Sequence, residues 1–211
     1  MENQISYVAV GLFLEKSVEE KIIKLSQKLY DEYDSWWRLS DVFPPHISLW
    51  LAYLPTKNEV AVIEEIKEIV KNIGSINVEL ADVDIKDNNK EYYVNQGIIK
   101  TEQLTNLHYV MLERLNQYRE EYICPKYLTE ESQNSMSDLM KENVKKYGTR
   151  FVAQLYDPHI SISFIDKGKV DKKAIEECIP AISGTYSCNE LIVFKQKESG
   201  KSIDVLSKIT F

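Results

Sequence analysis

Two short stretches of the chain are nearly identical: Pro45-His46-Ile47-Ser48-Leu49 and Pro158-His159-Ile160-Ser161-Ile162. They lie 113 residues apart (159 − 46) and contain two of the three histidines of the 211-residue chain. In each, a proline blocks a helix and an alternating, isoleucine-containing run follows, which is typical of a β-strand. We therefore predict one strand of similar design in each half of the chain.

Residues i and i+2 of a strand point to the same face, about 6–7 Å apart. The expected polar faces carry the motif histidines and serines: His46, Ser48 and Trp50 on the first strand, and His159, Ser161 and Ser163 on the second. The expected apolar faces carry Ile47, Leu49 and Leu51 on the first strand, and Ile160, Ile162 and Phe164 on the second. If the two strands face each other across a groove, two imidazoles and two hydroxyls meet there.

Two imidazoles suit a reaction that removes one proton and delivers another near neutral pH. Serine hydroxyls can donate hydrogen bonds to the non-bridging oxygens of a phosphoryl group, and such bonds to an anion are strong. Four donors around a phosphorus centre would supply the electrostatic stabilisation that is usually assigned to a metal ion. We therefore expect no metal and no other cofactor.

The rest of the chain alternates between strand and helix patterns. A helical insertion is expected around 124–150, with its helix at 131–147. Strands are expected at 5–14, 46–54, 76–85, 91–99, 159–165, 189–196 and 203–210, and helices at 17–33, 58–74, 101–121 and 171–179. Each half carries a Pro-His-Ile-Ser strand, then a helix, then a hairpin, so we predict an α+β fold of two similar lobes formed by a single domain, 1–211.

Composition excludes several classes of protein. With 44% hydrophobic and 28% charged residues the chain is not disordered, and no apolar run is long enough to span a membrane. The net charge of −7 disfavours binding of long duplex nucleic acid. Three cysteines without a CxxC pair, and an N-terminus without a basic leader, lead us to expect a cytoplasmic protein, and we expect a monomer.

The paired motifs resemble the two signature motifs of the 2H phosphoesterases, which include RNA 2′,3′-cyclic phosphodiesterases once named 2′-5′ RNA ligases. The resemblance implies two pseudo-symmetric lobes, each an antiparallel sheet with helices outside, around an open central cleft. It also implies metal-independent phosphodiester chemistry, with His46 and His159 as acid and base and Ser48 and Ser161 binding the phosphate. Both hydroxyls are serine where many members have threonine, and the 124–150 segment is long for the smaller bacterial members, which leaves the substrate more open than the reaction.

Outside the motifs, four residues are candidates for base stacking or for lining the cleft: Tyr7, Trp50, Tyr93 and Asn95. The alternatives are packing at a strand end for Tyr7, a core position for Trp50, and an exposed sheet face for Tyr93 and Asn95. His108 lacks the Pro-His-Ile-Ser frame, so a structural role is expected for it. The Trp36-Trp37 pair precedes the first motif in a loop, either as a cleft rim, as a patch for a partner or tucked against the protein.

The sequence thus predicts a phosphodiesterase that acts on a 2′,3′-cyclic phosphate or on a short or cyclic oligonucleotide, by general acid–base catalysis. One alternative is a phage-type phosphodiesterase that degrades a cyclic-oligonucleotide second messenger. Another is a module that binds a nucleotide without cleaving it, and a third is an interaction protein that uses the Trp36-Trp37 loop. Which histidine is the acid and which the base stays open, because the motifs are nearly symmetric.

Overall fold

The computed structural model describes residues 4–40, 42–88, 90–196 and 203–211. Within these residues two antiparallel sheets of four strands form, with the orders β2-β1-β7-β8 and β5-β4-β3-β6. The first sheet consists of β1 (Ile5–Leu12), β2 (Ile47–Pro55), β7 (Glu190–Gln196) and β8 (Ile203–Thr210). The second consists of β3 (Ile76–Asn88), β4 (Glu91–Ile98), β5 (His159–Asp166) and β6 (Gly184–Cys188).

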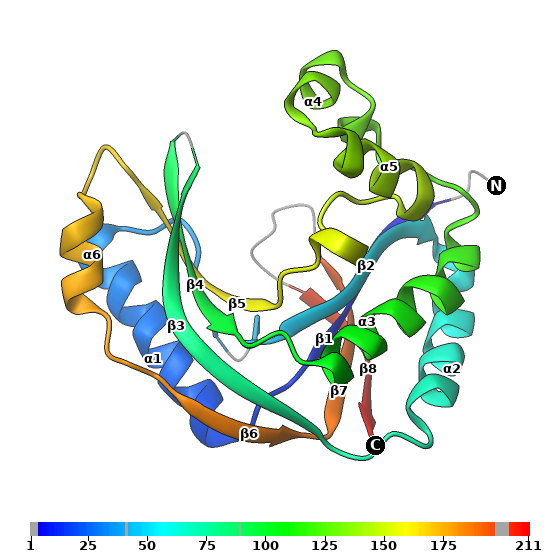
Figure 1. Cartoon of the computed structure of the whole chain (residues 1–211), viewed down its shortest axis with the longest axis horizontal. Helices are drawn as coiled ribbons and strands as arrows, with labels where there is room; N and C mark the ends of the chain where they lie inside the picture. The colour runs from blue at the N-terminus through cyan, green and yellow to red at the C-terminus, as the bar shows by residue number, and fades with distance from the viewer. Residues whose placement is uncertain (1–3, 41, 89, 197–202) are drawn as a thin grey trace.

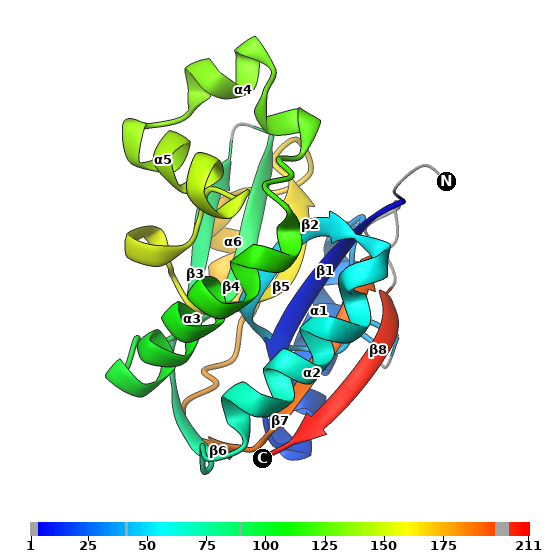
Figure 2. The same ribbon diagram turned by 90° about the vertical axis from the view of Figure 1, so that its right-hand side faces the viewer.

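Helices cover the outer side of each sheet (Figure 1). The helices α1 (Lys16–Tyr33) and α6 (Lys172–Cys178) lie on the sheet that contains β5, and α2 (Glu59–Val70) and α3 (Glu102–Leu115) lie on the sheet that contains β2. Figure 2 shows α2 running along the β1–β8 sheet. The predicted α+β fold of two lobes, each a sheet with external helices, is therefore confirmed.

The two halves of the chain are interwoven. The order β1-α1-β2-α2-β3 is matched by β4-α3-β5-α6-β7, except that two further helices lie between α3 and β5 and the strand β6 lies between α6 and β7. The third strand of each half pairs with a strand of the other half: β3 pairs with β4 of the second half, and β7 pairs with β1 of the first. The first helix of each half likewise packs against a strand of the other half, α1 against β5 and α3 against β2. Each motif strand is therefore held by a helix from the other half.

Most predicted elements are present with ends shifted by a few residues. The strand β6 was not predicted, because it is a short edge strand whose residues are mostly exposed and polar. An apolar stripe on α2 is buried at Val62, Ile66 and Ile69. In the part of the chain that the structure describes, no helix is both long enough and apolar enough to cross a membrane.

The segment of residues 116–152 begins with a short turn, Asn116–Arg119, that contacts β2, and it continues into an arm that stands away from the two sheets (Figures 1 and 2). It carries α4 (Glu130–Ser135) and α5 (Asp138–Tyr147), so the single helix expected at 131–147 is divided in two. The hydroxyl of Ser137 accepts from the Met140 N–H and starts the second helix. A small apolar cluster of Tyr127, Met136 and Val144 gives the arm a core of its own.

Candidate active site

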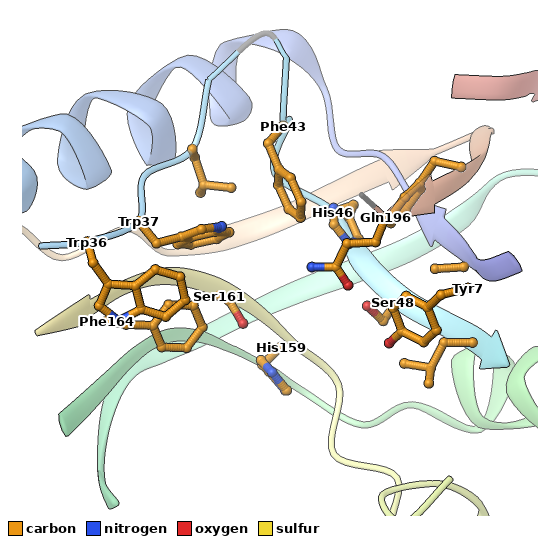
Figure 3. Close-up of a pocket in the computed structure, with 14 residues that line it drawn as sticks. Tyr7, Trp36, Trp37, Phe43, His46, Ser48, His159, Ser161, Phe164 and Gln196 are labelled. Carbon is orange, nitrogen blue, oxygen red and sulfur yellow. The ribbon is translucent and has the colours of Figure 1, made fainter. Parts of the chain in front are cut away.

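A cavity of about 370 Å³ lies where the two motif strands approach each other. Both motif histidines and both motif serines line it, so residues from the two halves of the chain meet at one place (Figure 3). The remaining wall is largely aromatic and aliphatic, and it consists of Tyr7, Ala9, Trp36, Trp37, Leu39, Phe43, Leu51, Phe164, Phe194 and Gln196.

The two imidazoles are oriented in the same way. Nδ1 of His46 lies 2.9 Å from the carbonyl oxygen of Pro44, and Nδ1 of His159 lies 2.8 Å from that of Asp157. In both cases the carbonyl belongs to the residue before the motif proline. A carbonyl only accepts, so Nδ1 must carry the proton and donate. This leaves the lone pair of each neutral ring on Nε2, and Nε2 is the atom that can take up or release a proton.

A β-bulge follows each motif serine. In the β1–β2 pair, Gly11 faces Ser48 and Val10 faces Trp50, so Leu49 is the extra residue. In the β4–β5 pair, Asn95 faces Ser161 and Val94 faces Ser163, so Ile162 is the extra residue. A bulge puts two residues opposite one and bends the strand. Beyond each bulge, the side chains therefore lie on the opposite face of the strand from the one that strict alternation assigns to them.

The bulges overturn part of the prediction from strict alternation. Trp50 is expected beside His46 and Ser48, but it is buried in the core with 3% of its surface exposed, and Leu51 lines the cavity instead. Ser163 is likewise expected beside Ser161, but it is fully buried. Phe164, predicted on the core face, lines the cavity. The placement of Trp50 in the cleft is therefore wrong, because alternation holds only up to the extra residue.

Each bulge is fastened by a side chain from the helix of the other half. The Nδ1–H of His108 on α3 donates to the Leu49 carbonyl at 2.6 Å, and the Ser26 hydroxyl on α1 donates to the Ile162 carbonyl at 2.6 Å. These are the carbonyls of the two bulged residues, and a buried carbonyl without a partner costs about 1–3 kcal/mol. His108 and Ser26 thus occupy equivalent places in the two halves, and both are buried.

The same two side chains also hold the loops that lead into the motifs. Nε2 of His108 accepts from the Ala153 N–H at 3.0 Å, and the Ser26 hydroxyl accepts from the Leu39 N–H at 2.9 Å. Since Nε2 of His108 accepts, its ring must be neutral. Burial lowers the pKa of His108 to about 4, opposed by the bond to the Leu49 carbonyl. His108 is therefore a structural residue outside the cavity.

The surroundings of His46 favour its neutral form. Its ring lies 5.0 Å from that of Phe194 and 5.8 Å from that of Phe43, between centroids. Burial lowers the pKa of His46, the bond to the Pro44 carbonyl partly opposes this, and the nearby His159 lowers it further. Gly11 makes room for the ring, because a Cβ there would lie 2.8 Å from Cδ2 of His46.

Of the other predicted cleft residues, Tyr7 lines the cavity. Asn95 is buried, and Tyr93 contacts Phe164 edge-on at 4.9 Å and accepts a hydrogen bond from Asn88, so neither belongs to the lining that the described residues form. Besides Tyr7, the aromatic wall had a second signal in the sequence, the Trp36-Trp37 pair considered as a cleft rim, and both tryptophans line the cavity. Phe194 had none, because its place depends on β7 crossing to pair with β1.

Across the described parts of the chain, no group of three or more histidine, cysteine, aspartate or glutamate side chains is placed to hold a metal ion. The motif side chains bring to the cavity the two Nε2 atoms and the hydroxyls of Ser48 and Ser161. This set can exchange protons and hydrogen-bond an oxyanion.

Comparison with known proteins gives a likeness in structure only. No protein-family model matches the chain. No curated protein matches it either. Among solved structures, Escherichia coli LigT complexed with 3′-AMP is similar with a TM-score of 0.59 and 11% identity, over 99% of both chains. The protein TT0787 of Thermus thermophilus is similar with a TM-score of 0.59 and 13% identity, over 97% of both chains.

A third structure, described as a phosphoesterase, is similar with a TM-score of 0.53 and 12% identity over 98% of both chains. Each of these matches covers nearly the whole chain, so it includes the arm as well as the two lobes. The protein has the fold of LigT, and the fold expected from the resemblance to the 2H phosphoesterases is confirmed.

Proposed function

We propose that this protein is a metal-independent phosphodiesterase of the 2H type. The observation that carries the proposal is the pair of equally oriented imidazoles, each fixed through Nδ1 so that Nε2 remains for chemistry, in one cavity with two serine hydroxyls. The fold shared with LigT and with a phosphoesterase supports it, and LigT has been crystallised with phosphate and with 3′-AMP. A nucleotide phosphodiester is accordingly the proposed substrate.

The environment of His46 supports its role as the base. Burial favours neutral His46, so its Nε2 takes the proton from the attacking water or hydroxyl. His159 in its protonated form then delivers a proton from Nε2 to the leaving oxygen. One P–O bond forms and one breaks, and the enzyme returns to its starting state when the two rings exchange protons with solvent. The hydroxyls of Ser48 and Ser161 donate to the non-bridging oxygens, where charge accumulates.

The proposal is tested with a panel of 2′,3′-cyclic mononucleotides, 2′-5′ and 3′-5′ dinucleotides and cyclic oligonucleotides, with the products analysed. We expect turnover of at least one class, unchanged by EDTA, and its loss in His46→Ala and His159→Ala. Binding of these compounds without hydrolysis would contradict the proposal and favour a nucleotide-binding module. Turnover that EDTA abolishes would contradict the metal-independent mechanism.

A further inference from the structure

The cavity has aromatic surfaces on both sides of its reactive groups. Figure 3 shows Trp36, Trp37 and Phe164 on one side of the histidines and Tyr7 on the other. Aromatic side chains in nucleic-acid-binding proteins stack on bases whatever the base, because every base has a π-face. Two separated surfaces of this kind raise the question of how many bases the cavity holds.

The first surface is built around Trp36. Its indole ring stacks on Phe164 with 5.2 Å between centroids and 14° between planes, and Phe164 also contacts Trp37 at 5.0 Å. The indole N–H donates to a carboxylate oxygen of Glu91 at 2.7 Å, which fixes the orientation of the ring. Despite these contacts, Trp36 is 45% exposed, and it lines the cavity. A rigid, exposed indole in a cavity wall is a ready platform for a base.

The second surface is built around Tyr7 and Tyr53. The two residues face each other across the β1–β2 ladder, and their rings lie 4.7 Å apart. Cross-strand partners share a face, so Tyr53 lies on the side of the sheet that carries Tyr7 into the cavity. The arm adds Tyr122, 6.4 Å from Tyr53, and Lys126, whose Nζ lies 5.5 Å from the centre of the Tyr53 ring. This second platform thus combines aromatic rings with a cation.

Charge restricts what can bind between the platforms. Among the described residues that line the cavity, none is a lysine, arginine, aspartate or glutamate. One protonated imidazole matches the single negative charge of a phosphodiester, whereas a phosphomonoester would bring a second charge that the described lining residues do not neutralise. Lys126 lies over the ring of Tyr53, which is the neighbour of Tyr7, and its cation can attract a further phosphate of a longer chain.

We propose that the substrate is a phosphodiester that joins two nucleosides, with one base on Trp36 and the other on Tyr7, and with an adjoining phosphate near Lys126. This inference rests on the proposed function and selects, among its substrates, linear or cyclic oligonucleotides over 2′,3′-cyclic mononucleotides. A cyclic mononucleotide has a single base and can use only one platform.

The test compares kcat/KM for adenylyl-adenosine, in its 3′-5′ and 2′-5′ forms, with that for adenosine 2′,3′-cyclic phosphate. The wild type is expected to prefer a dinucleotide. Trp36→Ala and Tyr7→Ala should each lower dinucleotide turnover by roughly 5- to 100-fold, as loss of one stacked base does. Only one of the two variants should affect the cyclic mononucleotide. Phe151→Ala, which removes an exposed aromatic ring outside the cavity lining, is the matched control.

A second comparison tests the cation. Adding a 5′-phosphate or a third nucleotide to the dinucleotide should increase kcat/KM several-fold. Lys126→Ala should remove this gain and should make kcat/KM for the extended substrate less dependent on salt. Lys145→Ala, an exposed lysine on α5 of the same arm, should leave the gain intact. Equal losses on all substrates in Trp36→Ala and Tyr7→Ala, or a wild type that prefers the cyclic mononucleotide, would overturn the inference.

Binding separates this inference from the proposed function. The inactive His46→Ala/His159→Ala chain should bind adenylyl-adenosine with a change in tryptophan fluorescence that Trp36→Phe greatly reduces. If the wild type cleaves nothing but both platform variants still weaken dinucleotide binding, the phosphodiesterase proposal fails and the two-base site stands. If dinucleotide binding is unaffected by both variants, the two-base site fails whatever the wild type cleaves.

Discussion

The strands β2 and β5 use the same backbone features to place the motif side chains in the two lobes. At the start of each, a histidine (His46 just before β2, His159 as the first residue of β5) has its Nδ1 fixed by the carbonyl two residues upstream. Each contains a bulge after the motif serine, and in each the bulged carbonyl accepts from a helix of the other half. These backbone features are therefore common to both lobes, in keeping with the two similar lobes predicted from the sequence.

The side chains around these features differ. His46 lies between Phe43 and Phe194, whereas His159 follows a loop that carries the exposed Asp157. The bulge in β2 is held by His108 and that in β5 by Ser26. The repeated backbone brings two similarly oriented imidazoles together, and the surroundings of one of them, His46, lower its pKa through burial. A lowered pKa keeps His46 in the neutral form that a general base requires.

Removing either motif histidine should have the largest effect on activity. His46→Ala and His159→Ala should each lower kcat by at least about 10²-fold, the usual contribution of a general acid or base. The double variant should lose little more than the worse single variant, because residues that act as a unit are not additive. Steady-state kinetics on correctly folded variants, checked by circular dichroism, test this. Near-wild-type turnover in either single variant would mean that the lobes do not cooperate in the reaction.

The motif serines should have a smaller effect. Loss of a hydrogen bond to a charged group costs about 1.5–3 kcal/mol, so Ser48→Ala and Ser161→Ala should each lower kcat by roughly 10- to 100-fold. Ser163→Ala is the matched control, because Ser163 lies past the bulge and donates to Ser35 at 2.9 Å inside the core. It should lower the free energy of unfolding and leave kcat nearly unchanged. Equal losses of kcat in Ser161→Ala and Ser163→Ala would contradict the assigned faces of β5.

The residues that hold the bulges should affect activity least and stability most. Ser26→Ala and His108→Ala each leave a buried carbonyl without its donor, so each should lower the free energy of unfolding by about 1–3 kcal/mol or more. His108 also stacks on Tyr156 at 3.8 Å between centroids, so its loss should cost more than that of Ser26. Urea unfolding measures both. Unchanged stability in both variants would contradict the fastening role.

The variants of the two lobes, His108→Ala and Ser26→Ala, should also differ in how the free energy of unfolding depends on pH. The pKa of His108 is about 4 in the folded protein and about 6.5 when exposed, so the unfolded chain binds this proton more readily. Its contribution is therefore present above pH 6.5 and is lost as the pH falls toward 4, by about 3 kcal/mol in total. This dependence should disappear in His108→Ala and persist in Ser26→Ala. Equal pH profiles of stability in the two variants would contradict a neutral, buried His108.

The motifs made the fold class predictable, and also the meeting of the four motif residues in one cavity, because proline, histidine and serine at fixed spacing indicate local strand geometry. Other features were not predictable from local pattern. The bulges at Leu49 and Ile162 are enforced by helices distant in sequence, so period-two reasoning placed Trp50 on the wrong face. The exchange of β3 and β7 between the halves is a long-range pairing, and it is what brings Phe194 beside His46.

The most direct test of two imidazoles acting on one phosphorus centre is the pH profile of kcat/KM in the wild type and the two histidine variants. The wild type should show a bell, with an acidic limb below the ordinary histidine pKa because burial lowers the pKa of His46. His46→Ala should lose the acidic limb and His159→Ala the alkaline one. A wild-type profile with one limb, or two limbs that survive in both variants, would contradict the account.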